Sequence, residues 1–170
     1  MILSKGNIVL RPFAQTDAVV MASLANNIAI WNNVRDSFPH PYTAADAAAF
    51  ISANSTMPTQ KFAITYNHEF CGGAGLTGGT DIYRIGAEIG YWLGEPWWGK
   101  GIATTAVQLI TNYGFEGLGF QRIYASVFPY NTASVRVLEK AGFQLEHIAR
   151  NAVIKNKVVY DNHVYVKLKP

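Results

Sequence analysis

Two glycines on either side of a lysine separate an apolar segment from a helical pattern, and this arrangement can bind phosphate. Residues 95–103 read Glu-Pro-Trp-Trp-Gly-Lys-Gly-Ile-Ala, shortly after the apolar run 87–93. Gly99 and Gly101 allow the backbone to approach a ligand closely, and the first N–H groups of the following helix point at an anion. The turn therefore predicts a ligand that carries phosphate.

Two familiar nucleotide-binding motifs do not match this turn. It lacks the Gly-Lys-Ser/Thr ending and the upstream spacing of a P-loop, and the six-residue pattern G-x-G-x-x-G of dinucleotide sites is absent. A helix start with two convenient glycines and no ligand is the alternative interpretation. The turn by itself leaves both interpretations open.

The elements that would position this turn follow from hydrophobic spacing and capping residues. Helices are expected over residues 17–26, 43–53, 101–115 and 131–141. Strands are expected over residues 7–13, 61–66, 70–76, 83–93, 121–128, 143–150 and 157–168. This order predicts an α/β fold with a mixed, mainly antiparallel sheet of about six or seven strands flanked by helices, and not a doubly wound parallel sheet.

Several boundaries depend on single residues or short polar runs. Asp17 is expected to cap the first helix, with Val20 and Leu24 on its apolar side. Residues 67–69 are expected to form a tight turn, and residues 151–156 a polar turn between the last two strands.

Composition and charge exclude several classes of protein. The chain has 170 residues, of which 49% are hydrophobic and 15% are charged, so it is expected to fold as one domain with a sizeable core. The net charge of +3 comes from scattered basic residues. No dense basic face is present, so we expect no nucleic-acid partner.

Cysteine content and hydropathy indicate the compartment. Cys71 is the only cysteine, so an intrachain disulfide is impossible, and its apolar surroundings favour a buried, unreactive thiol. No apolar run approaches the ~20 residues that span a bilayer, and the first residues lack a signal-peptide core. We expect a cytoplasmic protein with no membrane partner.

A second helix start makes the chain resemble a known family. Asn131-Thr-Ala-Ser134 opens a helix that ends in Leu138-Glu-Lys-Ala-Gly-Phe143. Together with Leu10-Arg-Pro-Phe13 and the segment 88–103, it resembles the GNAT superfamily of acyl-CoA-dependent N-acetyltransferases, and within it the RimJ/RimL branch that acetylates protein N-terminal amines. The resemblance implies one N-acetyltransferase domain over residues 1–170, with a GNAT-like sheet whose central strand pair is splayed.

The resemblance implies acetyl-CoA as the co-substrate and no metal. The family's pyrophosphate motif, Q/R-x-x-G-x-G/A, falls on Trp98, Gly101 and Ala103, so Trp98 departs from it. The pantetheine arm would pair with exposed backbone in the splayed gap. The residues expected to contact the cofactor are Ile89, Gly90, Tyr91, Trp92, Leu93, Trp98, Gly99, Lys100, Gly101, Ile102, Ala103, Thr104, Asn131, Ser134 and Lys140.

Attack of an amine on a thioester needs a proton acceptor and a polarised carbonyl. Glu88 is the only acid in an otherwise apolar strand and is the candidate base. An equal alternative is a structural carboxylate paired with Arg84 or with a backbone donor. A backbone N–H near Tyr91 is expected to polarise the thioester carbonyl.

The departing thiolate needs a proton or a hydrogen bond. Many GNAT members carry a tyrosine seven residues after the capping asparagine, but that position is Leu138 here. Ser134, the third residue of the helix that Asn131 caps, is expected to stabilise the thiolate together with the helix dipole. Tyr130 is a further possible acid, and ordinary packing near the cap is the alternative for Ser134.

The acceptor is expected to be a protein N-terminus or a small amine, acetylated directly in a ternary complex by a monomer or homodimer. The residues expected to contact it are Trp31, Phe38, His40 and Tyr83. One alternative is a degenerate GNAT domain that senses CoA without turnover, which the departures at Leu138 and Trp98 favour. Another is a nucleotide- or nucleic-acid-binding domain, which the scattered charge disfavours.

Overall fold

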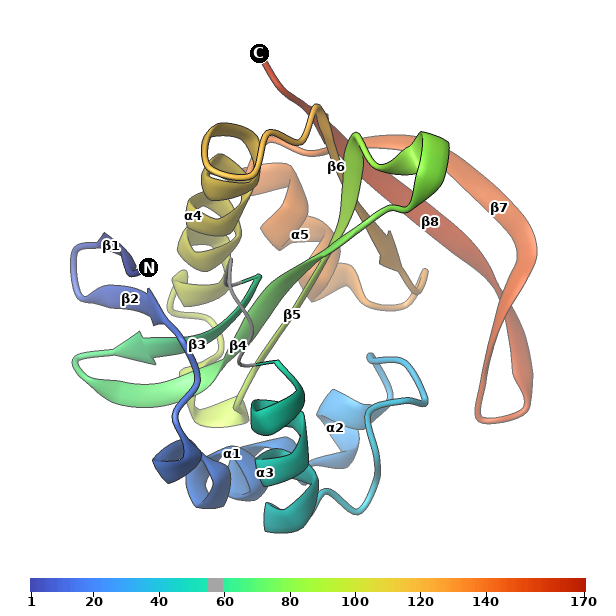
Figure 1. The fold of residues 1–170 in the computed structure, drawn as a ribbon. Coiled ribbons are helices and arrows are strands. Elements are labelled where there is room, and N and C mark those ends of the chain that lie inside the picture. Colours follow the sequence, from blue (N-terminus) through green and yellow to red (C-terminus); the bar gives the residue numbers. More distant parts are fainter. Residues whose placement is uncertain (55–59) are drawn as a thin grey trace.

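An eight-stranded sheet organises the computed structural model, which describes residues 1–54 and 60–170 (Figure 1). The strand order is β1-β2-β3-β4-β5-β6-β8-β7, with β5 and β6 parallel and the other neighbours antiparallel. The mixed, mainly antiparallel sheet flanked by helices is therefore confirmed, and β1 is a strand that the sequence pattern misses. The strands are β1 (Leu3–Lys5), β2 (Ile8–Arg11), β3 (Lys61–Tyr66), β4 (Glu69–Gly78), β5 (Gly86–Leu93), β6 (Arg122–Val127), β7 (Gln144–Lys155) and β8 (Val158–Leu168).

The helices form a layer on each face of the sheet (Figure 1). Helices α1 (Ala18–Ala25) and α3 (Ala44–Ala53) pack with Ala63, Phe70 and Trp92, while α2 (Ile28–Trp31) follows α1. Helices α4 (Ile102–Glu116) and α5 (Thr132–Lys140) pack against the opposite face. Eight residues of α4 are buried, among them Ala106, Val107, Ile110 and Tyr113, whose 3.6-residue spacing agrees with the predicted helical pattern.

The first helix differs from the prediction in two features, its N-terminal cap and the side that is buried. The side chain of Asp17 does not cap α1, because its carboxylate binds Arg11 and the N–H of Ala14. Val20 is 39% exposed, and Met21 is buried instead. Since α1 is apolar on almost every side, its sequence pattern does not determine which side faces the core.

The strand expected to start at Tyr83 begins later. Tyr83 lies in a short 3-10 helix, η2 (Asp81–Tyr83), and β5 starts at Gly86. The N–H of Gly79 bonds to the carbonyl of Gly86 (2.8 Å), which closes the β4–β5 hairpin at that point. The expected turn at residues 67–69 is confirmed.

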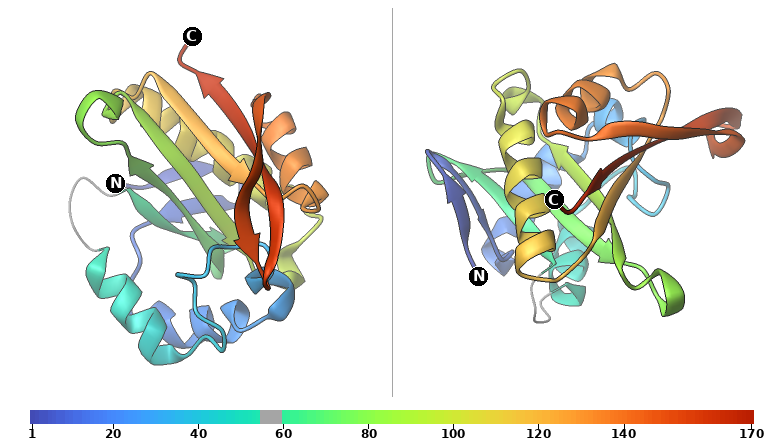
Figure 2. Two further views of the ribbon diagram at one scale, coloured as in Figure 1. Left: turned by 90° about the vertical axis from the view of Figure 1, so that its right-hand side faces the viewer. Right: turned by 90° about the horizontal axis from the view of Figure 1, so that it is seen from above.

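The turn expected at residues 151–156 is displaced to Asn156 and Lys157, which both have positive φ (51° and 65°). Strand β7 instead continues through Asn151, whose N–H bonds to the carboxylate of Asp161 (2.9 Å) at an irregularity in the pairing. The result is a long hairpin, β7–β8, that reaches out from the edge of the sheet (Figure 2).

The central strands β5 and β6 separate partway along their length. Residues 86–88 pair with residues 122–124, whereas β5 continues to Leu93 and β6 to Val127 without further pairing between them. The splayed strand pair that the family resemblance implies is therefore confirmed.

Backbone groups of β5 alternate between β4 and this opening. Gly86 bonds to Gly79, directly after the end of β4, and Gly94 bonds to Cys71 within β4, and bonding in an antiparallel pair alternates residue by residue. The N–H and C=O groups of Ile89, Tyr91 and Leu93 therefore point away from β4 and into the opening. A ligand lying there can bond to them as a further strand would.

Candidate active site

One cleft of about 1070 Å³ runs through the opening between β5 and β6. Its walls come from β4, β5, β6, α5, the chain after α2, and the turn that leads from η3 (Glu95–Trp97) into α4. Every residue expected to contact the cofactor lines this cleft, namely residues 89–93, residues 98–104, Asn131, Ser134 and Lys140. The fold thus brings together two segments that are separated in the sequence, residues 89–104 and residues 131–140.

The N-terminus of α4 forms one end of the cleft. Gly99 and Gly101 both have φ of +74°, and a Cβ atom on either would meet no other atom within 4 Å. The N–H of Thr105 makes the first helical bond, to Gly101, so the N–H groups of residues 102–104 precede it. Open space beside these amides fits a pyrophosphate group such as that of CoA.

Three cationic side chains line the cleft near these helices: Lys100 from the turn before α4, and Arg136 and Lys140 from α5. The Nζ atom of Lys100 lies 4.9 Å from the ring centroid of Trp97, so this side chain folds over the turn. Together with the helix N-terminus, these charges make this end of the cleft suitable for the several phosphates of CoA.

Trp98 stands where the pyrophosphate motif of the GNAT family has Gln or Arg, and its side chain bonds to the protein backbone. Its indole N–H donates a 2.8 Å hydrogen bond to the carbonyl of Leu93, at the end of β5. That carbonyl points into the opening, so Trp98 terminates the row of exposed backbone groups there. The free N–H groups at the start of α4 do not depend on this side chain.

Ser134 and Tyr91 form a hydroxyl pair inside the cleft. The Oη of Tyr91 lies 2.7 Å from Oγ of Ser134 and 3.2 Å from the Ser134 carbonyl oxygen. Asn131 accepts the N–H of Ser134 (3.1 Å), which confirms that it caps α5 with Ser134 in the third position. Burial raises the pKa of Tyr91 to about 12, against a smaller lowering by Ser134, so the phenol is neutral near pH 7.

Leu138, the position where many family members carry tyrosine, is fully buried in the core. Tyr91 reaches the mouth of α5 from β5 and places a phenol beside Ser134. From the sequence, only the backbone N–H of Tyr91 is expected to take part, because strand periodicity does not show which helix its side chain will meet. Tyr130 instead donates to the carbonyl of Asn32 (2.7 Å).

Glu88 lies where the two central strands separate. Its Oε1 atom accepts a 2.5 Å hydrogen bond from Nη2 of Arg35, which comes from the chain after α2. The expected pairing with Arg84 is wrong, since Arg84 bonds to the carbonyl of Asp81. Glu88 is thus an ion-paired carboxylate that also lines the cleft, and both of its possible roles remain compatible with this geometry.

The residues expected to bind the acceptor do not form one group. Phe38 lines the cleft, but Trp31 and His40 pack on each other behind it, with ring centroids 5.6 Å apart. Tyr83 is 73% exposed in η2 and does not line the cleft.

Two charged residues near Glu88 are not predicted as site residues from the sequence. Lys61 and Arg35 both line the cleft. Lys61 is the charged first residue of an otherwise uncharged strand, which is a weak signal, whereas nothing local distinguishes Arg35. Their proximity to Glu88 depends on the pairing of β3, β4 and β5 and on the path of the chain after α2.

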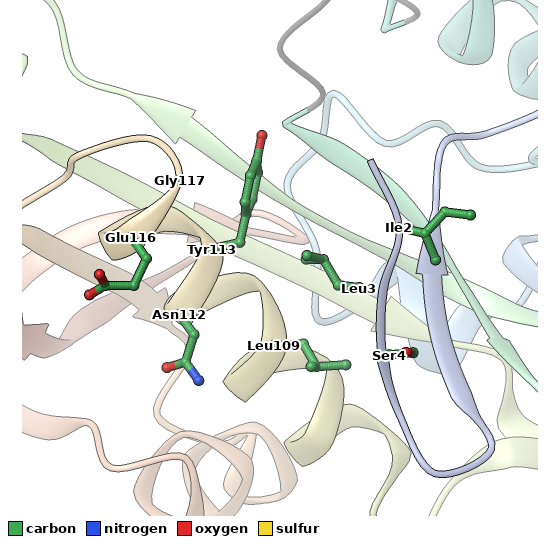
Figure 3. Close-up of a pocket in the computed structure, with 8 residues that line it drawn as sticks. All are labelled: Ile2, Leu3, Ser4, Leu109, Asn112, Tyr113, Glu116 and Gly117. Atoms are coloured by element: carbon green, nitrogen blue, oxygen red, sulfur yellow. The ribbon is translucent and has the colours of Figure 1, made fainter.

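A second depression, of about 540 Å³, lies between β1 and α4 (Figure 3). Figure 3 shows Leu3 of β1 facing Leu109 and Tyr113 of α4 across it. None of the residues expected to take part in chemistry lines this depression.

Three further features lie outside the cleft. Cys71 is buried, as expected, and burial raises the pKa of its thiol to about 11, which disfavours a nucleophilic thiolate. The described residues contain no group of three or more His, Cys, Asp or Glu side chains that could hold a metal ion. No helix among them is long and apolar enough to cross a membrane.

Known proteins are similar to this chain in sequence and in fold. Residues 7–144 match the acetyltransferase (GNAT) domain family. The chain is 50% identical over 84 residues to the probable N-acetyltransferase YjcK of Bacillus subtilis (49% of this chain, 46% of YjcK), and 31% identical over 132 residues to the uncharacterized N-acetyltransferase YnaD of the same organism (75% of each). The structure of the ribosomal L7/L12 alpha-N-protein acetyltransferase RimL in complex with coenzyme A superposes with a TM-score of 0.88 at 19% identity, over 99% of this chain and 98% of RimL.

The chain therefore belongs to the GNAT acetyltransferase family, as its sequence motifs suggest. The likeness to RimL extends the agreement to the whole fold. The match to YjcK spans about half the length of that relative.

Proposed function

We propose that this chain is a single N-acetyltransferase domain that moves an acetyl group from acetyl-CoA to a primary amine by direct transfer. The observation that carries the proposal is the cleft in the β5–β6 opening. It joins the amides at the start of α4, the Ser134–Tyr91 pair and Glu88 in one continuous space.

The start of α4 would hold the pyrophosphate of CoA through the N–H groups of residues 99–104. Lys100, Arg136 and Lys140 supply opposite charge near it. The exposed backbone of Ile89 and Tyr91 would bond to the pantetheine arm. Acetyl-CoA itself supplies the thioester, whose acetyl group is already activated.

The N–H of Tyr91 points into the opening and is the donor best placed to polarise the acetyl carbonyl. As the amine attacks, negative charge grows on the carbonyl oxygen, and a fixed N–H in a water-poor cleft stabilises that charge. Because the bonding alternates along β5, Tyr91 can point its N–H into the opening while its side chain meets α5.

Glu88 is the proposed base. An α-amino group has a pKa of about 7.7–8, so a substantial fraction is protonated at neutral pH and must lose a proton before it attacks. The Oε1 atom of Glu88 is bound by Arg35, whereas Oε2 can accept that proton directly or through a water molecule. Arg35 would orient the carboxylate in this role.

Ser134 would stabilise the departing thiolate. When Tyr91 donates its single phenolic proton to Oγ of Ser134, the hydroxyl proton of Ser134 can point at the sulfur. The start of α5 adds the positive end of the helix dipole. The thiolate finally takes up one proton, which balances the proton that the amine loses.

Two classes of acceptor remain within this proposal, a protein N-terminal amine and a small amine. The first is supported by the RimL likeness and by the RimJ/RimL-type motifs. The second is supported by the similarity to the spermidine N(1)-acetyltransferase of Escherichia coli, which is 26% identical over 84% of this chain and 76% of that protein. The alternative is a CoA sensor without turnover, which the absence of a tyrosine at position 138 favours. This alternative loses support, because the phenol of Tyr91 provides a hydroxyl group beside Ser134.

A release assay tests the proposal directly. The purified chain is incubated with acetyl-CoA and a panel of small amines and N-terminal peptides, and both free CoA and the acetylated product are measured. Glu88→Gln should lower turnover by about 10²–10⁴-fold at neutral pH if Glu88 is the base. Arg35→Gln, which removes the ion pair but keeps the carboxylate, should cost less. CoA binding without release for every amine would overturn the proposal in favour of a sensor.

A further inference from the structure

The acceptor end of the cleft is one face of the sheet, and the strand register defines its residues. Lys61 on β3 pairs with Gly75 on β4, and Gly75 pairs with Gly90 on β5. Glu88 lies two residues before Gly90 and pairs with Tyr124 on β6. Directly paired residues, and residues two apart on one strand, project to the same face. All five positions therefore face the same side of the cleft.

Glycines keep the floor of this face open. A Cβ atom on Gly90 would meet no other atom within 4 Å, whereas a Cβ atom on Gly75 would lie 2.3 Å from Cδ of Lys61. The aliphatic stem of Lys61 thus crosses Gly75, and its Nζ atom donates to Oγ1 of Thr77 (2.6 Å). The ammonium group is held at the edge of the open space above Gly90.

The charges around this space do not balance. Arg35 and Lys61 are cationic, and Glu88 is the one carboxylate among the described residues that line the cleft. Glu88 is already paired with Arg35. Burial lowers the pKa of Lys61, the nearby Glu88 raises it and Arg35 lowers it, so the three groups act on one another. A half-buried cation without a carboxylate of its own is stabilised when an anion binds beside it.

We propose, on the basis of the proposed acetyltransferase function, that the acceptor carries an anionic group, a carboxylate or a phosphate, close to the amine that is acetylated. Lys61 and Arg35 bind the anionic oxygens, the ammonium as a point charge and the guanidinium through donors that Glu88 does not use. The amine then lies above Gly90, between Glu88 and the N–H of Tyr91.

The same arrangement disfavours an acceptor with several positive charges. A polyamine would bring a second ammonium group toward Lys61 and Arg35, and the single carboxylate of Glu88 is already shared with Arg35. Like charges in a partly desolvated cleft repel each other, so such an acceptor would bind poorly.

Matched acceptor pairs test the proposal in the purified chain with acetyl-CoA. The pairs are L-amino acids and their amides, phosphoethanolamine and ethanolamine, and tripeptides with Asp or Asn in the second position. The measured quantity is kcat/KM for CoA release, with the product confirmed by mass. Conversion of a carboxylate to an amide lowers the pKa of the neighbouring amine, so a larger fraction of the amide acceptor has an unprotonated amine. Amine ionisation therefore favours the amide, and it cannot explain a preference for the acceptor that carries the anion.

We expect at least one pair in which the anionic member is preferred by about tenfold or more, the size expected for one hydrogen bond to a charged group. The pair that shows the preference identifies the source of the anion. Lys61→Met and Arg35→Gln should each reduce that ratio. Lys5→Met, at an exposed lysine on β1 outside the cleft, should leave the ratio as it is.

The outcomes separate this proposal from the function on which it rests. Failure of every amine to release CoA would overturn the acetyltransferase function itself. Transfer with equal kcat/KM within all pairs, or a higher rate with spermidine than with any anionic acceptor, would overturn the anionic-acceptor proposal alone. A preference that survives in both Lys61→Met and Arg35→Gln would overturn the assignment of the two residues.

Discussion

Tyr91 contributes to the candidate site through both its main chain and its side chain. Its N–H points into the β5–β6 opening, while its phenol bonds to Ser134 on α5. The phenol has a single proton and two acceptors within reach, Oγ and the carbonyl oxygen of Ser134. Only donation to Oγ leaves the hydroxyl proton of Ser134 available to the thiolate, so the orientation of Ser134 depends on Tyr91.

Tyr91→Phe should lower kcat by about 10–10²-fold and change the KM for acetyl-CoA little, because the ring and the backbone N–H remain. Ser134→Ala should have a similar effect. The double variant should be no slower than the slower single variant, since both act on one hydrogen-bonded pair. Steady-state kinetics of the three variants provide the measurement, and fully additive effects would contradict the coupling.

Asp17 illustrates a carboxylate that stabilises the fold away from the cleft. It is nearly buried and accepts two bonds from Arg11 (2.7 and 2.8 Å) and one from the N–H of Ala14 (2.8 Å). Burial alone would raise the pKa of its carboxyl group, but the bonds from Arg11 and Ala14 outweigh burial and leave the pKa lowered. The folded state therefore prefers the ionised form more strongly than the unfolded state does.

Asp17→Asn should reduce the free energy of unfolding by about 1–3 kcal/mol at pH 7. A lowered folded-state pKa contributes stability above the unfolded value of about 3.9, and this contribution is lost as the pH falls through the folded value. The difference from the wild type should therefore shrink below about pH 4. Urea unfolding at several pH values measures it, and Glu116→Gln, at an exposed carboxylate, is the control.

At the scale of elements, the turn before α4 has a left-handed backbone at two glycines and open space beside it. Gly101 adopts a left-handed conformation that favours glycine, and it stands directly before the helix. Gly119, just after the same helix, has nearly the same φ (+77°) and equally open surroundings, but it does not line the cleft. Substitutions at these two glycines therefore distinguish two effects. Both force a side chain into a left-handed backbone, but only a substitution at Gly101 also fills space in the cleft.

Gly101→Val should weaken CoA binding by about tenfold or more, because the side chain occupies the space where phosphate approaches the amides. Gly119→Val should cost a similar amount of stability, about 1–2 kcal/mol, without affecting CoA binding. Calorimetric titration with CoA and thermal unfolding distinguish the two effects. Wild-type affinity in Gly101→Val would reject the start of α4 as the phosphate site.

The β7–β8 hairpin is fixed to the chain after α2 by a buried lysine. Lys155 is only 1% exposed, and its Nζ atom lies 2.8 Å from Oδ1 of Asp36 and 3.7 Å from the ring centroid of Trp31. A cation on an aromatic face with a carboxylate beside it needs little further solvation. Because Asp36 adjoins Arg35, this contact holds the segment that reaches Glu88.

Lys155→Met should reduce stability by about 1–3 kcal/mol through loss of the cation–π contact and the ion pair. It should also raise the KM for the acceptor more than the KM for acetyl-CoA, since Arg35 loses its support. Lys157→Met, at the exposed turn of the same hairpin, should change stability by no more than about 0.5 kcal/mol. Equal effects of both substitutions on KM would show that the hairpin does not position the acceptor end.

At the scale of the whole molecule, the proposed function depends on a sheet that is divided at its centre. Strands β1 to β5 form one part and β6 to β8 the other, and the two parts pair only over three residues of each central strand. Helices α4 and α5 lie on one face with their N-terminal ends lining the cleft, whereas α1 and α3 cover the other face. The cofactor end and the acceptor end can therefore approach one reacting carbonyl from opposite sides of the sheet.

The sequence alone determines the features that depend on local periodicity and on single special residues. The helix spacing of α4, the cap at Asn131 and the turn glycines all follow from it, because helix period, capping and positive φ are properties of short segments. The cofactor end of the cleft is built from such features, so its residues can be predicted.

Only the tertiary structure decides the acceptor end. Glu88 pairs with Arg35 instead of Arg84, Lys61 stands over Gly75, and Tyr91 meets Ser134. Lys155, which the sequence assigns to a polar turn, is buried against Trp31. These contacts join segments separated by 14 to over 100 residues in the chain, and they depend on strand register and hairpin length. A shift of one residue in register would turn each side chain to the other face, which local sequence patterns do not specify.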